Sequence, residues 1–164
     1  MTQERETAIP APTGVPSSIP NAEVVKALNF KLQHVGMAVA ELGPATDLLT
    51  SLFGYQLVSG PFDDPIQRVS VNFLSTRATD LAEIELIAPL TEDSPIRAML
   101  AKGGGAAYHL CFETSDLDQA LRHATQLQCI IVSPPAPAVA FGGRRIAWIY
   151  TKSRQLFELV EAPR

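Results

Sequence analysis

The stretch Tyr108-His-Leu-Cys-Phe-Glu113 is a short apolar run with a histidine near its start, and it stands between Gly103-Gly-Gly105 and Thr114-Ser-Asp116. An apolar run of this length between turn-forming residues predicts a buried strand. The run His34-Val-Gly-Met-Ala-Val39 repeats the pattern weakly in the first half of the chain, and each run precedes a helix-like segment. The histidine strand is therefore the feature around which both halves are organised.

Each half also ends on a strand that carries a carboxylate. Glu85 lies within Ile84-Glu-Leu-Ile87, and Glu158 lies within Phe157-Glu-Leu-Val160. The two glutamates are separated by nearly the same stretch of chain as the two histidines, and self-similarity at one spacing indicates a duplicated unit. We expect each unit to contribute one histidine and one glutamate.

Bulk composition excludes several classes of function. The chain has 164 residues, of which 46% are hydrophobic and 18% charged, which suits one globular domain, and no apolar run is long enough to span a bilayer. Its net charge of -4, with scattered lysines and arginines, gives no basic patch for nucleic acid. We therefore expect neither a nucleic acid nor a membrane as a partner.

The cysteines and the first residues favour a cytoplasmic location. Cys111 lies in a predicted core strand and Cys129 follows a predicted helix, so we interpret both as free thiols in a reducing compartment. Glu4 and Glu6 stand where a secretory signal needs basic and then apolar residues.

The chain divides into a tail and one domain. Residues 1–22 contain four prolines and little that could form a core, which predicts a flexible Pro-rich tail, with a weak helical signal beginning at Ala22. Residues 23–164 are predicted to form a single domain whose two modules cover about 31–92 and 105–162.

Both modules show the element order β-α-β-β-β, which predicts an α+β fold. The first module has a helix expected over 42–53 with an apolar face of Leu48, Leu49, Leu52 and Phe53, and the second has a helix from Ser115 or Asp116. We expect a loop over 60–65 and a Pro-rich link over 134–137. The strands are expected at Lys31–Val39, Tyr55–Val58, Arg68–Ser75, Glu83–Ile87, Ala107–Glu113, Cys129–Val132, Arg145–Thr151 and Leu156–Val160. Two βαβββ modules paired in one domain imply two curled sheets side by side around a shared cleft.

The candidate site follows from that pairing. A lone histidine or glutamate among aliphatic residues is more often a satisfied core or edge residue than a ligand. Matched pairs in duplicated units would instead converge about a pseudo-twofold axis. Two imidazoles and two carboxylates, from His34, Glu85, His109 and Glu158, form a mixed set suited to a divalent ion such as Co, Zn, Ni or Mn.

Three further residues have weaker signals. His123 lies in the middle of a predicted helix and is expected to be a solvated surface residue. Asp63 and Asp64 precede a proline, where they are either ordinary turn formers or loop acids that face the cleft.

These motifs together resemble the methylmalonyl-CoA epimerases of the vicinal oxygen chelate (glyoxalase and bleomycin-resistance) superfamily. The resemblance covers about 32–162 and rests on the two histidine strands, the two glutamate strands and Asp93-Ser-Pro-Ile96, which follows the first glutamate strand. It implies the vicinal oxygen chelate fold, a homodimer and a small-molecule substrate such as an acyl-CoA or other thioester.

The resemblance also implies a metal bound by His34, Glu85, His109 and Glu158, and a reaction in which the α-proton of a malonyl-type thioester is abstracted. Epimerisation needs a base on one face of the substrate and an acid on the other. The glutamate that serves as a base in these epimerases corresponds to Ile66 in this chain, and isoleucine cannot transfer a proton. Either Asp63 or Asp64 substitutes for it, or the fold serves different chemistry. Glu158 could act as a base as well as a ligand.

Two alternatives remain open. One is another enzyme of the superfamily, either a glyoxalase-like lyase or isomerase with a different substrate or an iron-dependent dioxygenase. Dioxygenases of this kind use two histidines and one carboxylate, so Glu85 as a fourth ligand argues against them. The other is a binding protein of the bleomycin-resistance type, which holds a small molecule without reaction. Such proteins generally lack the metal ligands.

Overall fold

The structure is a computed structural model that describes residues 22–76, 82–102 and 107–163. The predicted tail lies outside the described residues, except for its last residue, Ala22, with which the first helix begins. The elements in order are α1 (Ala22–Leu28), β1 (Lys31–Ala38), α2 (Leu42–Phe53), β2 (Gln56–Asp64), β3 (Val69–Ser75), β4 (Glu83–Pro89), α3 (Pro95–Leu100), β5 (Ala107–Thr114), α4 (Leu117–Gln126), β6 (Ile130–Pro137), a short 3-10 turn η1 (Val139–Phe141), β7 (Arg145–Tyr150) and β8 (Leu156–Glu161).

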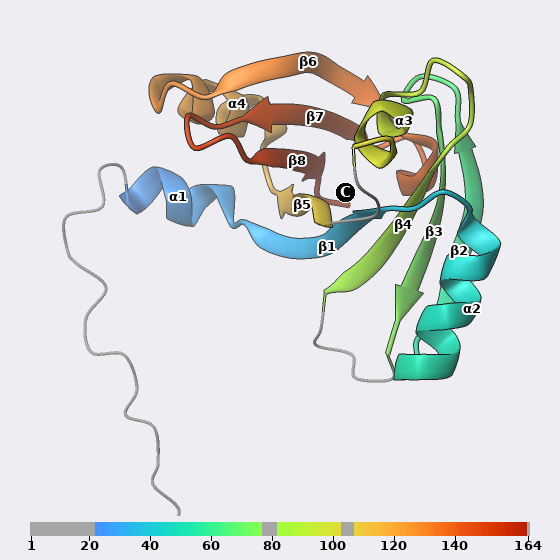
Figure 1. Cartoon of the computed structure of the whole chain (residues 1–164). Coiled ribbons are helices and arrows are strands. Elements are labelled where there is room, and N and C mark those ends of the chain that lie inside the picture. Colours follow the sequence, from blue (N-terminus) through green and yellow to red (C-terminus); the bar gives the residue numbers. More distant parts are fainter. Residues whose placement is uncertain (1–21, 77–81, 103–106, 164) are drawn as a thin grey trace, which may run out of the picture.

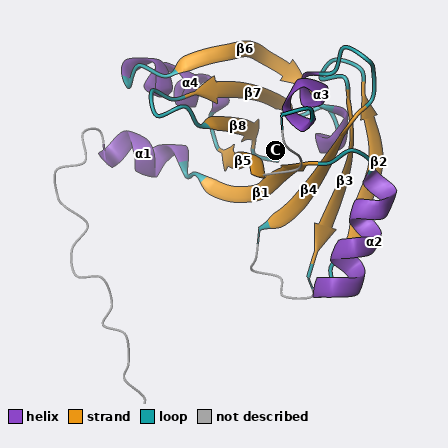
Figure 2. Cartoon of the chain, in the orientation of Figure 1, coloured by secondary structure: helices purple, strands orange, loops and turns teal. Residues whose placement is uncertain are grey.

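All the strands belong to one curled sheet in the order β2-β3-β4-β1-β5-β8-β7-β6 (Figures 1 and 2). Each module supplies one half of this order, with the same pairing: β1 is parallel to β4, and β5 is parallel to β8. The predicted βαβββ duplication is confirmed. The two halves are not separate sheets, however, because β1 and β5 pair antiparallel in the middle and join them.

The edge strands β2 and β6 are longer than predicted. β2 continues through Pro61 to Asp64, where we expected a loop, and β6 continues through Pro134 and Pro135, where we expected a link. Proline cannot donate a ladder hydrogen bond, so it is tolerated in a strand that lacks a neighbour on one side. Both strands stand at an edge of the sheet, and both have register shifts along their single pairing.

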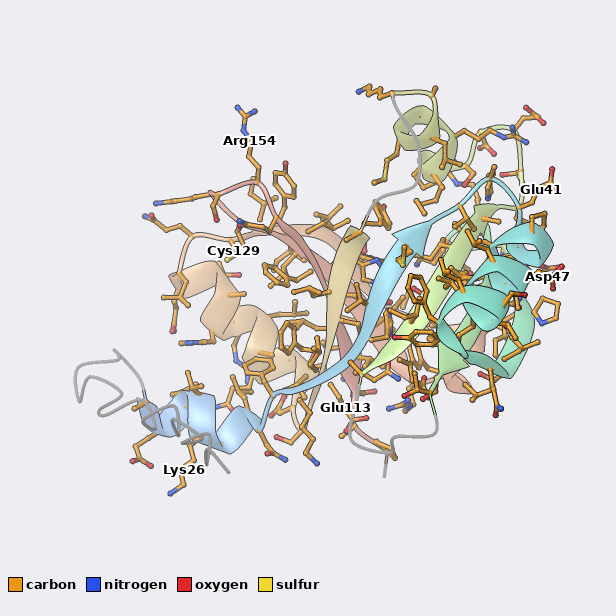
Figure 3. The ribbon with its side chains drawn as sticks, turned by 60° about the horizontal axis from the view of Figure 1, so that its bottom comes forward. Lys26, Glu41, Asp47, Glu113, Cys129 and Arg154 are labelled. Carbon is orange, nitrogen blue, oxygen red and sulfur yellow. The ribbon has the colours of Figure 1, made fainter. Side chains whose placement is uncertain are left out.

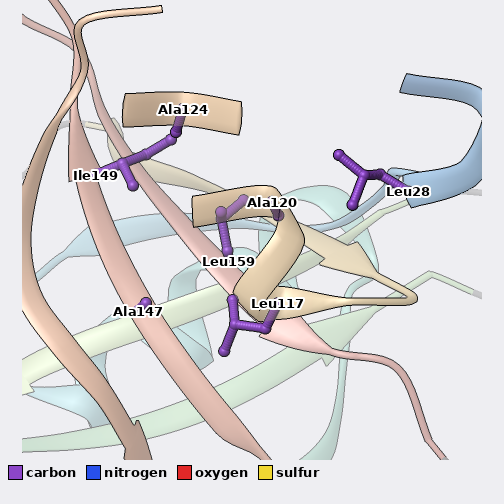
Figure 4. Packing of buried hydrophobic residues seen from close by; sticks show 7 residues of the cluster. All are labelled: Leu28, Leu117, Ala120, Ala124, Ala147, Ile149 and Leu159. Atoms are coloured by element: carbon purple, nitrogen blue, oxygen red, sulfur yellow. The ribbon is translucent and has the colours of Figure 1, made fainter. Parts of the chain in front are cut away.

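The α4 helix covers the second half of the sheet and closes the largest cluster of buried apolar residues. Asp116 caps this helix by accepting a hydrogen bond from the backbone N–H of Gln119 at 2.8 Å. The cluster joins α1, α4, β7 and β8 through Leu28, Leu117, Ala120, Ala124, Ala147, Ile149 and Leu159 (Figure 4). His123 on the same helix is also buried, which corrects the predicted surface position.

The α2 helix differs from the prediction in which side chains it buries. Of the predicted apolar face, Leu48, Leu52 and Phe53 are 60%, 63% and 62% exposed, and Leu49 alone is partly buried. The helix lies on the opposite side of the molecule from Cys129, with Glu41 and Asp47 at its surface (Figure 3). None of the helices in the described part of the chain is long and apolar enough to cross a membrane.

Candidate metal centre

The four predicted ligands lie on the four central strands of the sheet. His34 is on β1, Glu85 on β4, His109 on β5 and Glu158 on β8. Strand register brings them together in a symmetric pattern. Gly36 pairs with Glu85 on one side and with His109 on the other, and Cys111 pairs with both His34 and Glu158.

All four side chains point to one place. Their ligand atoms lie within 4.8 Å of one another, and all four residues are buried. Nε2 of His34 is 2.8 Å from Nε2 of His109, 3.1 Å from Oε2 of Glu85 and 3.3 Å from Oε2 of Glu158. Nε2 of His109 lies 3.5 Å from Glu85 and 3.4 Å from Glu158.

The proximity of these groups shifts their pKa values in opposite directions. Burial lowers the pKa of His34, but the adjacent carboxylates of Glu158 and Glu85 outweigh burial and raise the pKa to about 9. Burial raises the pKa of Glu158, but His109 and His34 outweigh it and lower the pKa to about 2. The pocket therefore holds negative charge that attracts a cation, here a proton.

The residues fit a divalent ion. Two neutral imidazoles and two carboxylates are a donor set that Co, Zn, Ni and Mn accept. Oε2 of Glu158 is buried without a hydrogen-bond partner among the described residues, although it faces both ligand nitrogens. Buried unpaired oxygens are costly, and a shared cation at this point would satisfy it.

Gln33 orients one of the two histidines. Its Oε1 contacts Nδ1 of His34, and its Nε2 donates to Oε2 of Glu83 at 3.3 Å. With Nδ1–H donated to Gln33, Nε2 of His34 faces the other ligands, and loss of its proton would leave a lone pair for an ion. The contact depends on a register shift in β1, where Leu32 pairs with Phe112 and His34 pairs with Cys111, so that Gln33 is an extra residue.

A cavity of about 210 Å³ opens beside the cluster and is lined by Glu85, His109 and Glu158. Its walls are mostly apolar, and they include Trp148, whose ring meets the edge of the His109 ring at a centroid distance of 4.7 Å. A ligand in this cavity would contact three of the four residues of the cluster directly, as expected for a binding or active site.

The two candidate loop acids differ in position. Both lie in β2 rather than in a loop, and Asp64 is buried and lines the cavity, whereas Asp63 is exposed and does not line it. Oδ1 of Asp64 accepts hydrogen bonds from the backbone N–H groups of Ile66 at 2.8 Å and Gln67 at 2.9 Å. Ile66 itself is 57% exposed.

Sequence reasoning missed Gln33, Gly36 and Trp148. Gln33 and Gly36 lie in the first histidine strand on either side of His34, but neither residue type indicates a ligand-supporting role without the strand register. Trp148 is the only tryptophan of the chain and lies in a strand with clear apolar character, which is typical of a core residue.

Comparisons with known proteins agree with this fold. Residues 33–148 match the model of the Glyoxalase/Bleomycin resistance protein/Dioxygenase superfamily. The chain belongs to that superfamily.

Among its relatives are enzymes that are named as epimerases. The ethylmalonyl-CoA/methylmalonyl-CoA epimerase of Cereibacter sphaeroides is 29% identical over 123 residues, which cover 74% of this chain and 89% of the relative. The mitochondrial methylmalonyl-CoA epimerase of Dictyostelium discoideum is 31% identical over 134 residues, which cover 80% and 78%. The crystal structure of methylmalonyl-CoA epimerase from Mycobacterium tuberculosis has a TM-score of 0.73 at 33% identity and covers 84% of this chain and 91% of that one. These homologues place the chain among the isomerases of the superfamily.

Proposed function

We propose that this protein is a metal-dependent epimerase or isomerase that abstracts the α-proton of a malonyl-type acyl thioester. The observation that carries the proposal is the convergence of His34, Glu85, His109 and Glu158, whose ligand atoms lie within 4.8 Å of one another beside a cavity. The names of the relatives support the acyl-CoA substrate class. A divalent ion held by these four residues would act as a Lewis acid that stabilises the negative charge of an enolate.

Glu158 is the first candidate for the base. It lines the cavity, so a substrate bound there would contact this carboxylate. Proton transfer needs a group within hydrogen-bond reach of the substrate, and a ligand residue in the cavity wall meets that requirement.

Asp64 is the candidate for the second acid or base. It lines the same cavity from the end of β2, and its two backbone hydrogen bonds occupy Oδ1 only. Within the described part of the chain no group forms a hydrogen bond with the second oxygen, which could therefore transfer a proton. Asp63, the other candidate, is exposed and outside the cavity, so it supports this role less well.

Ile66 favours one alternative. The resemblance places a glutamate base at this position, and an isoleucine cannot replace it, so a different isomerase or lyase reaction on another chelating substrate is the second candidate function. That reaction would need Glu158 alone as a base. The homodimer and the cytoplasmic location stay predictions, as does a binding protein of the bleomycin-resistance type.

The proposal is tested by exchange of the α-proton of methylmalonyl-CoA with deuterated water. We expect exchange by protein loaded with Co²⁺, loss of exchange after treatment with a chelator, and recovery when Co²⁺ is restored. Glu158→Gln keeps an oxygen ligand but removes the base, so this variant should bind metal and catalyse at least 100-fold slower exchange. Metal-loaded protein that catalyses no exchange with any malonyl-type thioester would refute the proposal.

A further inference from the structure

The strand β5 contains an extra residue directly before the metal-ligand candidate His109. Gly36 of β1 pairs with His109, and the next residue, Met37, pairs with Ala107, so Tyr108 has no partner in the register. Successive side chains of a regular strand point to opposite faces, but a bulge turns the extra side chain away from that alternation. As a result, both Tyr108 and His109 line the cavity.

The same irregularity occurs at the equivalent place in the first module, where Gln33 is the extra residue directly before His34. There the extra side chain contacts Nδ1 of the histidine. In the second module Nδ1 of His109 is buried without a partner among the described residues, and no described group forms a hydrogen bond with the Tyr108 hydroxyl. The extra residue of the bulge therefore forms a hydrogen bond with Nδ1 of the histidine in the first module but not in the second.

The surroundings of Tyr108 fix its ring and leave its hydroxyl available. The ring is 5.3 Å from the ring of His109 and 6.1 Å from that of Trp148 between centroids. The side chain is half-buried, and it also packs against the cluster that contains Ile96. A polar group held in the wall of a mostly apolar cavity is a typical determinant of ligand orientation.

We propose that Tyr108 is a substrate-binding residue, whose hydroxyl donates a hydrogen bond to an oxygen of the substrate held in the cavity beside His109. This inference rests on the proposed function, because it assumes a substrate with oxygens directed at the four-residue cluster. Tyr108 stands at the bulge position that Gln33 has in the first module, and its hydroxyl serves the ligand instead of the histidine.

The test is the binding of acetohydroxamate, a small chelator with two oxygens, to Co²⁺-loaded protein. Calorimetry and the visible absorption of Co²⁺ measure its affinity for the wild type, Tyr108→Phe and Tyr150→Phe. Tyr150→Phe is the matched control. It removes the same hydroxyl from a strand of the same sheet, but Tyr150 does not line the cavity. Cobalt content and thermal unfolding show that each variant is folded and loaded.

We expect acetohydroxamate to bind Tyr108→Phe about tenfold more weakly than the wild type, as for the loss of one hydrogen bond, and Tyr150→Phe to bind it equally well. Equal affinities of the wild type and Tyr108→Phe would overturn the inference while leaving the proposed function intact. Wild-type protein that holds Co²⁺ but does not bind the chelator would overturn both, because no substrate oxygen would then be directed at this site.

Discussion

Gly36 on β1 and His109 on β5 are paired so closely that the imidazole occupies the space of a missing side chain. A Cβ atom at Gly36 would lie 2.2 Å from Cε1, 2.4 Å from Nδ1 and 2.8 Å from Nε2 of His109. Real Cβ atoms do not approach other heavy atoms at such distances, so the ring keeps its position only beside a glycine. Because Gly36 also pairs with Glu85, the same residue lies between two of the four proposed ligands.

Gly36→Ala should therefore displace the His109 ring and weaken metal binding. We expect at least tenfold lower affinity for Co²⁺, with the protein still folded, because one of four ligands is moved. Metal content after dialysis and competition with a chelator measure the effect.

Gly43→Ala is the matched control for this variant. Gly43 lies in α2, where an added Cβ would have no neighbour within 4 Å, and alanine is a better helix residue than glycine. This control should bind Co²⁺ like the wild type and be slightly more stable. Unchanged affinity in Gly36→Ala would show that His109 does not hold the metal in its observed position.

Gln33→Leu should weaken metal binding in a different way. It removes the acceptor from Nδ1 of His34 without filling the space between the ligands, so the histidine loses its orienting partner. Loss of such a partner typically costs 10- to 100-fold in metal affinity, and we expect a value in this range from titration with Co²⁺. Gln56→Leu, at the exposed start of β2, is the control and should leave the affinity unchanged. Equal loss in both variants would point to a general effect on the sheet.

The sequence alone predicted the βαβββ duplication because each half repeats a histidine strand and a glutamate strand. It also predicted the convergence of His34, Glu85, His109 and Glu158, since duplicated units meet about a pseudo-twofold axis. The supporting residues could not be predicted in this way. Gly36 and Gln33 depend on which residue of β1 faces which residue of β5, and the register shifts that determine this have no signature in either strand.

Predictions from the sequence were wrong where the outcome depends on tertiary contacts. Leu48, Leu49, Leu52 and Phe53 form an apolar helix face, which normally predicts burial, yet only Leu49 is partly buried and the other three residues are exposed. His123 was expected at the surface because of its polar neighbours, but α4 turns it toward the sheet. Pro134 was read as part of a link because proline usually ends a strand, and only the edge position of β6 permits it.

Metal-free protein should be most stable at about pH 5 to 6. The raised pKa of His34, about 9, stabilises the fold fully below its unfolded value of 6.5, and this contribution is lost as the pH rises through 9. The lowered pKa of Glu158, about 2, contributes above its unfolded value of 4.5, and this contribution is lost as the pH falls through 2. Thermal unfolding measured from pH 3 to 10 should show the loss of stability on both the acid and the alkaline side.

Loading with metal should change this profile, because the ion must displace the proton from His34. The apparent affinity for Co²⁺ should therefore rise with pH up to about 9, with proton release detected by calorimetry in buffers of different ionisation enthalpy. An affinity that does not depend on pH between 6 and 9 would contradict a protonated His34 in the metal-free protein.

The variant Asp64→Asn distinguishes the structural role of Asp64 at the end of β2 from its proposed role in proton transfer. Asparagine retains Oδ1 as an acceptor for the N–H groups of Ile66 and Gln67, so the backbone should keep its path, but it cannot transfer a proton. If Glu158 serves one face of the substrate and Asp64 the other, the variant should still exchange the α-proton of one epimer of methylmalonyl-CoA with deuterated water. Conversion between the epimers should fall about 100-fold.

Asp63→Asn is the control for this prediction, because Asp63 is the exposed neighbour that does not line the cavity. It should epimerise methylmalonyl-CoA at the wild-type rate, as followed by chiral analysis of the product alongside mass spectrometry of deuterium uptake. A loss of epimerisation in Asp63→Asn but not in Asp64→Asn would reverse the assignment. Wild-type rates of epimerisation in both variants would mean that a group other than Asp63 and Asp64 serves the second face of the substrate.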